Sequence, residues 1–342
     1  MSMGMDYDKP HLTYADQVAK MQQRGIVCPD QDAAIGLVEM VGYYRLSAYI
    51  YPFRELLPPD QRQKVSRAHF RAEEIRCNTH ISDIESLWRF DRKLRLKCLD
   101  ALETVEVGLR TRLAYVLGRR DVFGHVNRES LEPDSCDEPS LRPALGAHHA
   151  PADRFDEWIE RYRKLESDAK NEDYVVHHRG KYGGELPIWI AVEFLDFGAL
   201  ARLFQLLRKV DQNEIASAMG VKGGPLLGRW LRDLNYLRNL CAHHSRLWNR
   251  TLTYKAGNFN KTQVGEDLQH VASGGSREKL YVPIACLAYL TRRISPRSTW
   301  PLDLRTHVKK FPVIEGISPG RDMGFVEGWE SLPLWNAVPA KG

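Results

Sequence analysis

Residues 81–118 read ISDIESLWRFDRKLRLKCLDALETVEVGLRTRLAYVLG, and they decide the fold class. Apolar side chains recur there in steps of four and three, at positions 94, 98, 102, 105, 109, 113 and 116. This period places them on one face of an α-helix. Before Gly118 the stretch contains no proline and a single glycine, Gly108, which a helix tolerates. The stretch therefore predicts one long helix with a continuous buried stripe.

The sequence predicts further helices on both sides of this stretch, whereas the evidence for strands is thin. Capping residues and glycine stops predict further helices at about 13–24, 30–42, 152–168, 198–210 and 278–293. HHRGKYGGELP at 177–187 predicts a glycine-broken loop. Pro225 begins a segment that is free of proline and glycine from Arg229 to Ala256, and one helix or two helices meeting at Asn235 both remain open. We predict an all-α helical bundle with extra helices.

Length and composition fit a soluble protein of mainly one domain. The 342 residues are 43% hydrophobic and 27% charged, which is enough for a full core. We expect a body at 1–300 and an irregular, proline-rich tail at 301–342 packed on it. The longest apolar run, 281–290, falls well short of the roughly 20 residues that span a bilayer. With no signal-peptide pattern and six scattered cysteines, we expect a cytoplasmic protein without a membrane span.

Basic residues gather in two segments although the formal net charge is only +5. Residues 86–120 hold nine Lys/Arg against four Asp/Glu, and residues 229–255 hold six against one. Such segments predict a surface that attracts phosphate. Long solvated helices are also usually charged, so charge alone favours the two interpretations equally.

Residues 230–250, WLRDLNYLRNLCAHHSRLWNR, concentrate aromatic, arginine and histidine side chains as nowhere else in the sequence. At about 100° per residue, Asn239 and His243 stand one above the other on a helix, while Arg238 lies well round from His243. A site that uses all three needs Arg238 near a helix start, or a second copy of the motif from another subunit.

These residue types suit RNA cleavage without a metal. Histidine has an unperturbed pKa of about 6.5, so His243 can take or give a proton near neutral pH. Arg238 offers a planar fork of donors for the charge that grows on the phosphorus, and Asn239 can orient the imidazole or the phosphate. The structural alternative is a solvated helix face with a histidine pair at the polar edge of a core.

Other side chains are candidates for support. His244, Arg246 and Arg250 follow the motif and are candidate RNA contacts. Three charged residues share one face of the long helix: Glu103, Glu106 and Arg110. Glu106 and Arg110 either form a surface ion pair, or this face meets the arginine and histidine segment and orients Arg238 through a carboxylate.

No cofactor or metal is expected. The sequence has no P-loop, no GxGxxG fingerprint and no CxxC pair. Histidine doublets occur at 148–149, 177–178 and 243–244, but adjacent side chains on a helix diverge, and no carboxylate follows the last two doublets at helical spacing.

Four separated stretches carry a family resemblance: GYYRLSAYIYPFR at 42–54, FDRKLRLKCLDALETVEVGLR at 90–110, PIWIAVEFLDFGAL at 187–200 and RNLCAHHSRLWNR at 238–250. In this order they resemble the Abi family of bacterial abortive-infection proteins, the AbiD/AbiF group, over about residues 15–255. That family belongs to the HEPN superfamily, whose mark is an arginine followed four to six positions later by a histidine. Arg238 and His243 match this mark, with Asn239 in the polar position that often follows the arginine.

The resemblance implies a HEPN core at about 80–255 and a homodimer in which two motifs meet. It implies antiviral defence by a metal-independent endoribonuclease with a toxin-like action. RNA is the implied substrate, and a small non-coding RNA encoded nearby is an expected further partner, as in a toxin–antitoxin pair. The alternative is a non-catalytic RNA-binding module that grips a structured RNA.

The aromatic residues of 42–54 either stack on bases or fill a core, and a core is the commoner use of such spacing.

Overall fold

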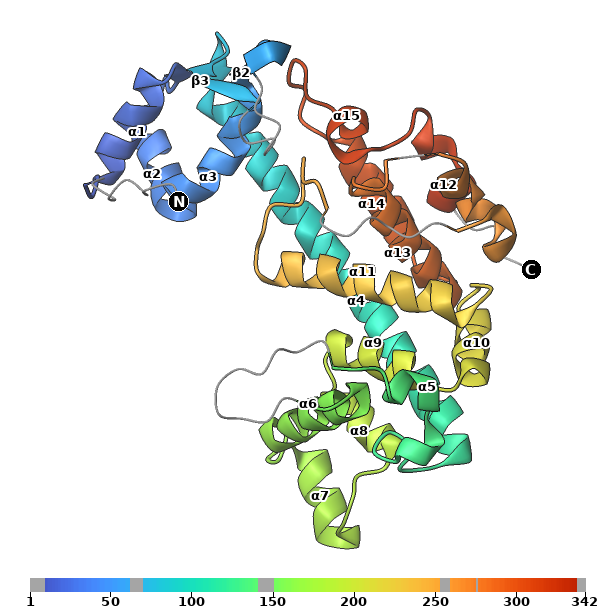
Figure 1. The fold of residues 1–342 in the computed structure, drawn as a ribbon. Helices are drawn as coiled ribbons and strands as arrows, with labels where there is room; N and C mark the ends of the chain where they lie inside the picture. The colour runs from blue at the N-terminus through green and yellow to red at the C-terminus, as the bar shows by residue number, and fades with distance from the viewer. Residues whose placement is uncertain (1–9, 62–69, 141–150, 253–258, 275, 337–342) are drawn as a thin grey trace. The chain divides into compact units, whose positions relative to one another are not determined.

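The computed structural model describes residues 10–61, 70–140, 151–252, 259–274 and 276–336 (Figure 1). In this part of the chain fifteen α-helices accompany two pairs of short strands, so the all-α prediction is confirmed. The chain divides into two compact units. The first comprises Met1–Lys93 and Phe311–Ile317, and the second comprises Leu94–Lys310 and Ser318–Gly342. One helix, α4 (Ile81–Arg120), supplies residues to both.

The first unit contains three helices that precede α4, namely α1 (Tyr14–Gln23), α2 (Gln31–Val41) and α3 (Tyr43–Ile50). Thr13 caps α1, because its hydroxyl accepts from the backbone N–H of Asp16 at 3.2 Å and the Asp16 carboxylate accepts from the backbone N–H of Thr13 in return. Asp30 caps α2 by accepting from the N–H of Ala33 at 2.9 Å. Both predicted helix starts are confirmed.

Four short strands also belong to the first unit. Strand β1 (Ile26–Val27) pairs in parallel with β4 (Thr79–His80), and β2 (Arg54–Leu56) pairs antiparallel with β3 (Arg71–Ile75). These pairs are too short to form a layer of their own, so the helices supply most of the unit's buried surface.

The aromatic stretch at 42–54 divides between the core and the surface. Tyr49 and Phe53 are buried, and the Tyr49 hydroxyl donates to the Asp91 carboxylate at 2.6 Å. Tyr44 is 90% exposed. The core interpretation is therefore correct for Tyr49 and Phe53, and it does not apply to Tyr44.

The buried stripe of α4 is present as predicted. All seven of its apolar positions are 4% exposed or less: Leu94, Cys98, Leu102, Val105, Leu109, Leu113 and Val116. Gly108 lies on α4 where α13 (Tyr281–Ile294) approaches closely. A Cβ at position 108 would stand 2.7 Å from Cγ2 of Ile294, so the two helices pack this closely only because glycine is there.

The remaining helices belong to the second unit: α5 (Pro133–Cys136), α6 (Arg154–Asp168), α7 (Asp173–Tyr182), α8 (Ile188–Phe194), α9 (Phe197–Leu206), α10 (Lys209–Ala218), α11 (Gly224–Ala242), α12 (Gln269–Ser273), α13, α14 (Trp300–Lys309) and α15 (Pro319–Met323). Helix α11 packs against α9, α10 and α13, and α6 packs against α9 (Figure 1). Apolar residues on α9, α11 and α13 form much of the core of this unit.

Two predicted boundaries in the second unit are wrong. Residues 177–182 continue α7 through Gly180, which has open space around it, and the helix ends only where Gly183 adopts a φ of 63°. Helix α9 ends at Leu206 and not at position 210, because Leu207 is extended and a new helix begins at Lys209. Both boundaries depend on tertiary packing, in which Val175 and Leu207 are fully buried, and local glycine and leucine patterns do not report this packing.

The described part of the predicted tail is ordered helix and turn. The ring N–H of Trp300, at the start of α14, donates to the carbonyl of Lys97 at 2.7 Å, and Trp335 is fully buried. Residues 311–317 belong to the first unit and residues 318–336 to the second, while 337–342 lie outside the described residues. No helix in the described ranges is both long enough and apolar enough to cross a membrane.

Candidate active site

Helix α11 carries the first part of the candidate site. Gly223 precedes it with a φ of 111°, a region that favours glycine, and Pro225 fits the first turn, where its missing N–H leaves no bond unmade. Leucine side chains and Trp230 form the buried side of the helix. Asn235 lies inside α11 and caps nothing, so the segment up to Ala242 is one helix.

The end of α11 is a Schellman turn. The N–H of His244 donates to the carbonyl of Cys241 at 3.0 Å, and the N–H of Ser245 donates to the carbonyl of Leu240 at 2.9 Å. His243 is the C-cap, and His244 has a φ of 55°, a left-handed conformation that glycine usually provides. Both histidine side chains are exposed. Such conformations recur at functional sites, which makes this turn a candidate.

Arg238 and Asn239 line a hollow of about 300 Å³ between α11 and the start of α9. Arg161, Asp196 and Arg202 line it from the other side. Arg161 forms an ion pair with Asp196, whose carboxylate also caps α9 by accepting from the N–H of Ala199 at 2.8 Å. The half-buried Arg238 makes no hydrogen bond or ion pair with any residue in the described ranges. Its five donors are therefore available to a ligand in the hollow.

His243 does not line this hollow. It follows Arg238 by five residues, which turns a helix through about 140° in excess of one full turn. Arg238 lies four residues before the end of α11 and is not near a helix start. Of the two arrangements that would unite Arg238 and His243, the position of Arg238 near a helix start is therefore not present.

Glu106 pairs with Arg110 and not with Arg238. The two side chains form an ion pair at 2.6 Å, and Arg110 also donates to the carbonyl of Leu195 at 3.0 Å. Burial raises the pKa of the Glu106 carboxyl, and the positive charges of Arg110 and then of Arg238 oppose this rise. Arg238 thus acts on Glu106 through its field alone, and Glu103 is exposed. Glu106 and Arg110 therefore form an ion pair, but this pair is half-buried and is not the surface ion pair that was predicted.

The segment after α11 is held by its own buried residues. Leu247 and Trp248 are fully buried, whereas Arg246 and Arg250 are half-buried, and the Arg250 guanidinium donates to the Arg246 carbonyl at 3.4 Å. Arg95 on α4 is only 5% exposed, and it donates to the carbonyl of Ser245 at 3.5 Å. The long helix therefore helps to hold the turn that presents the two histidines.

Two of the three histidine doublets lie in the described residues, and neither gathers with other potential ligands. The doublet at 177–178 lies on α7, the doublet at 243–244 ends α11, and 148–149 lies outside the described residues. In the described ranges, no group of three or more His, Cys, Asp or Glu side chains is placed to hold a metal ion.

Sequence reasoning missed part of the hollow. Asp196 lies within the quoted stretch 187–200, but nothing in that stretch marks it as part of a site. Arg161 had no recognisable signal, because it is one of many charged residues on α6. Arg202 is the one charged residue of α9 and belongs to no motif. Their role depends on the packing of α6 against α9 and of α9 against α11.

These features define an all-α protein with an arginine-lined hollow beside a helix that ends in exposed histidines. A family model described as Abi-like protein matches residues 37–249, more than half of the chain. The chain therefore belongs to the Abi-like protein family, as the resemblance of its four stretches predicted. Membership of this family suggests a role in abortive-infection defence. No curated protein and no solved structure matches the chain.

Proposed function

We propose that this protein is a metal-independent endoribonuclease of the HEPN type that acts in abortive-infection defence. The observation that carries the proposal is the guanidinium of Arg238, which has no partner in the described ranges and lines a hollow together with Arg161 and Arg202. Asp196 is the one carboxylate of that lining. Three guanidinium groups around so small a space favour an anion with several oxygens, such as a phosphodiester.

The reaction follows from the groups available. An imidazole takes the proton of the ribose 2′-OH, the 2′-oxygen bonds to the neighbouring phosphorus, and the bond from phosphorus to the 5′-oxygen breaks. The same imidazole then gives its proton to the leaving 5′-oxygen. Arg238 stabilises the added charge on the phosphorane, and Asn239 orients the phosphate. The products carry 2′,3′-cyclic phosphate and 5′-hydroxyl ends.

The histidine of this reaction comes from a second copy of the chain. His243 is exposed at the end of α11 and does not line the hollow of its own Arg238. In a two-fold homodimer the same surface meets itself, so His243 of each copy approaches the Arg238 hollow of the other. Cleavage then requires dimerisation.

The product ends test the chemistry. Purified protein is incubated with a single-stranded RNA in EDTA, and the ends are identified by mass spectrometry. We expect cyclic phosphate ends and no cleavage of an RNA whose ribose at the cut site is deoxyribose. A requirement for magnesium, or 5′-phosphate ends, would contradict the mechanism.

Mixing two inactive variants tests the composite site. Arg238→Ala and His243→Ala chains are each inactive alone, but a mixed dimer contains one site with an intact arginine and an intact histidine. Free exchange of subunits makes half of the dimers mixed, so about a quarter of the wild-type rate returns. No recovery, together with proven exchange, would show that each site is built within one chain.

The alternative is an RNA-binding module that does not cut. Its specific support is that the cations of the hollow suffice to grip phosphates without His243. Salt-sensitive RNA binding by wild type and His243→Ala alike, with no cleavage under any condition including phage infection, would favour this module over the enzyme.

A further inference from the structure

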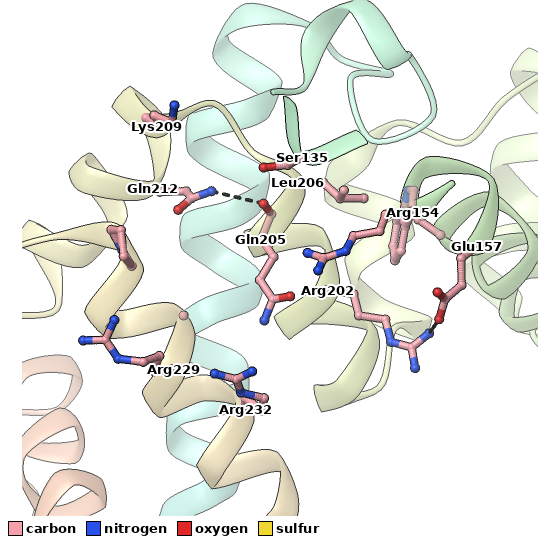
Figure 2. Close-up of a pocket in the computed structure, with 14 residues that line it drawn as sticks. Ser135, Arg154, Glu157, Arg202, Gln205, Leu206, Lys209, Gln212, Arg229 and Arg232 are labelled. Atoms are coloured by element: carbon pink, nitrogen blue, oxygen red, sulfur yellow. Dashed lines mark hydrogen bonds and ion pairs between the residues drawn. The ribbon is translucent and has the colours of Figure 1, made fainter. Parts of the chain in front are cut away.

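A second and larger cavity, of about 790 Å³, adjoins the hollow of Arg238 in the second unit. Figure 2 shows Arg154 and Arg202 on one side of it, Arg229 and Arg232 on α11 opposite them, and Gln205 between. Arg202 lines both the cavity and the hollow, so the two spaces are neighbours. The proposed ribonuclease reaction makes no use of this cavity.

The cavity is strongly basic. Five cationic side chains and one carboxylate, Glu157, line it. Arg202 pairs with Glu157 at 3.0 Å, Arg154 pairs with Glu138, and Lys209 lies 3.9 Å from Glu132 and Asp134. Each of the two arginine pairs uses part of a guanidinium and leaves further donors. Arg232, which is exposed, makes no hydrogen bond or ion pair within the described ranges.

The cavity also contains uncharged hydrogen-bonding groups and apolar side chains. The amide of Gln212 donates to the backbone carbonyls of Gln205 and Leu207, which leaves its side-chain oxygen as an acceptor. The Gln205 side chain points into the space between the arginines (Figure 2) and makes no hydrogen bond within the described ranges, so it offers a donor and an acceptor. Leu206 and Pro225 add apolar wall. The volume lies within the roughly 300–1,000 Å³ typical of cavities that enclose small organic ligands.

We propose that this cavity binds a nucleotide, with its phosphate groups on the arginines and its base edge on the glutamine amides. A planar guanidinium matches phosphate oxygens in a bidentate manner, and an amide matches the donor and acceptor pattern of a base. The nucleotide comes from one of two sources. It is either a free nucleotide, or one residue of an RNA strand that continues past Arg202 to Arg238.

Two probes distinguish the sources in the full-length protein. The first is ATP in EDTA, followed by titration calorimetry. The second is a fluorescein-labelled 12-nucleotide RNA with 2′-O-methyl riboses, followed by fluorescence anisotropy. The methyl group blocks the 2′-OH, so this RNA binds without being cut and its affinity is measured independently of any ribonuclease activity.

Two variants report on the cavity. Arg232→Glu reverses the charge of a side chain that has no partner in the described ranges, and Gln205→Glu places a carboxylate at the centre with almost no change of shape. We expect each to raise the Kd of the probe that binds by about tenfold or more. The matched control is Arg297→Glu, an exposed arginine that lines neither space, and it should change the Kd by less than about twofold.

Each outcome supports or overturns the binding of a nucleotide in this cavity. Loss of ATP affinity alone identifies a free nucleotide, and loss of RNA affinity alone identifies a strand. Loss of both identifies a cavity open to either source. If neither probe binds, or if both cavity variants behave like Arg297→Glu, the proposal is overturned. Failure of Arg238 and His243 to cut RNA leaves the proposal standing, because the binding assay does not depend on cleavage.

Discussion

Substitution of Arg238 by alanine tests whether its side chain acts in the reaction or stabilises the fold. Arg238 makes no hydrogen bond or ion pair in the described ranges, and two of its neighbours in the hollow, Arg161 and Arg202, carry the same charge. Arg238→Ala should therefore change the free energy of unfolding by no more than about 0.5 kcal/mol. A donor aimed at the transition state is worth about 2.7–4 kcal/mol, so the cleavage rate should fall by about 10²- to 10³-fold.

The assay measures both quantities on the same preparation. Single-turnover cleavage of a fluorogenic RNA in EDTA gives the rate, and urea unfolding followed by circular dichroism gives the free energy. Arg238→Lys keeps the charge but loses the planar fork, so its rate should lie between those of wild type and Arg238→Ala. Arg297→Ala removes an exposed arginine outside the hollow and is the matched control for both measurements.

Two results would refute this reasoning. A rate that stays within about twofold of wild type in a folded Arg238→Ala protein would mean that Arg238 does not touch the reacting phosphate. A loss of more than about 1.5 kcal/mol in the free energy of unfolding would mean that the side chain is structural.

Three further predictions concern stability, measured by urea unfolding. His244→Gly should raise the free energy of unfolding by about 0.5–1 kcal/mol, since glycine adopts the left-handed φ of 55° without strain, and a fall would mean that the imidazole itself stabilises the turn. Gly108→Ala should lower the free energy of unfolding by about 1–3 kcal/mol, because its Cβ would meet Ile294 at 2.7 Å. The matched Gly180→Ala has open space around it and should raise the free energy of unfolding by about 0.5–1 kcal/mol. Equal effects of the two substitutions would contradict the close approach of Ile294 to Gly108. Burial lowers the pKa of His125 to about 4. As the pH falls, this histidine is therefore protonated in the unfolded chain before it is protonated in the folded chain. Stability should fall by about 3 kcal/mol as the pH drops from about 6.5 to 4, and a His125→Phe chain with the same slope would exclude His125 as the cause.

Local signals in the sequence were sufficient for the long helix α4 and for the starts of α1 and α2. The stripe of α4 repeats over seven positions, and Thr13 and Asp30 cap helices with their own side chains. Each of these signals lies within one element, so no knowledge of the packing was needed. Gly180 misled the prediction because a single glycine inside a helix has no local signature that separates it from a stop.

The candidate site was less accessible to sequence reasoning. Arg238 and Asn239 stood out because they lie in one motif with His243. Their neighbours Arg161 and Arg202 come from α6 and α9, and no spacing in the chain links either of them to α11. Only tertiary packing turns these separate charges into one hollow.

The geometry of α11 also bears on how activity can be controlled. Arg238 and His243 are about 7.5 Å apart along the helix axis and project in different directions, so the proposed reaction relies on a second copy to bring both residues to the same phosphate. If the composite site is correct, the isolated chain holds every catalytic group and is nevertheless inactive, because the missing element is a second copy. Activity then depends on protein concentration and on anything that covers the end of α11. If this Abi-like protein acts in abortive-infection defence, as its family suggests, a composite site gives a physical reason for the chain to be harmless until copies assemble.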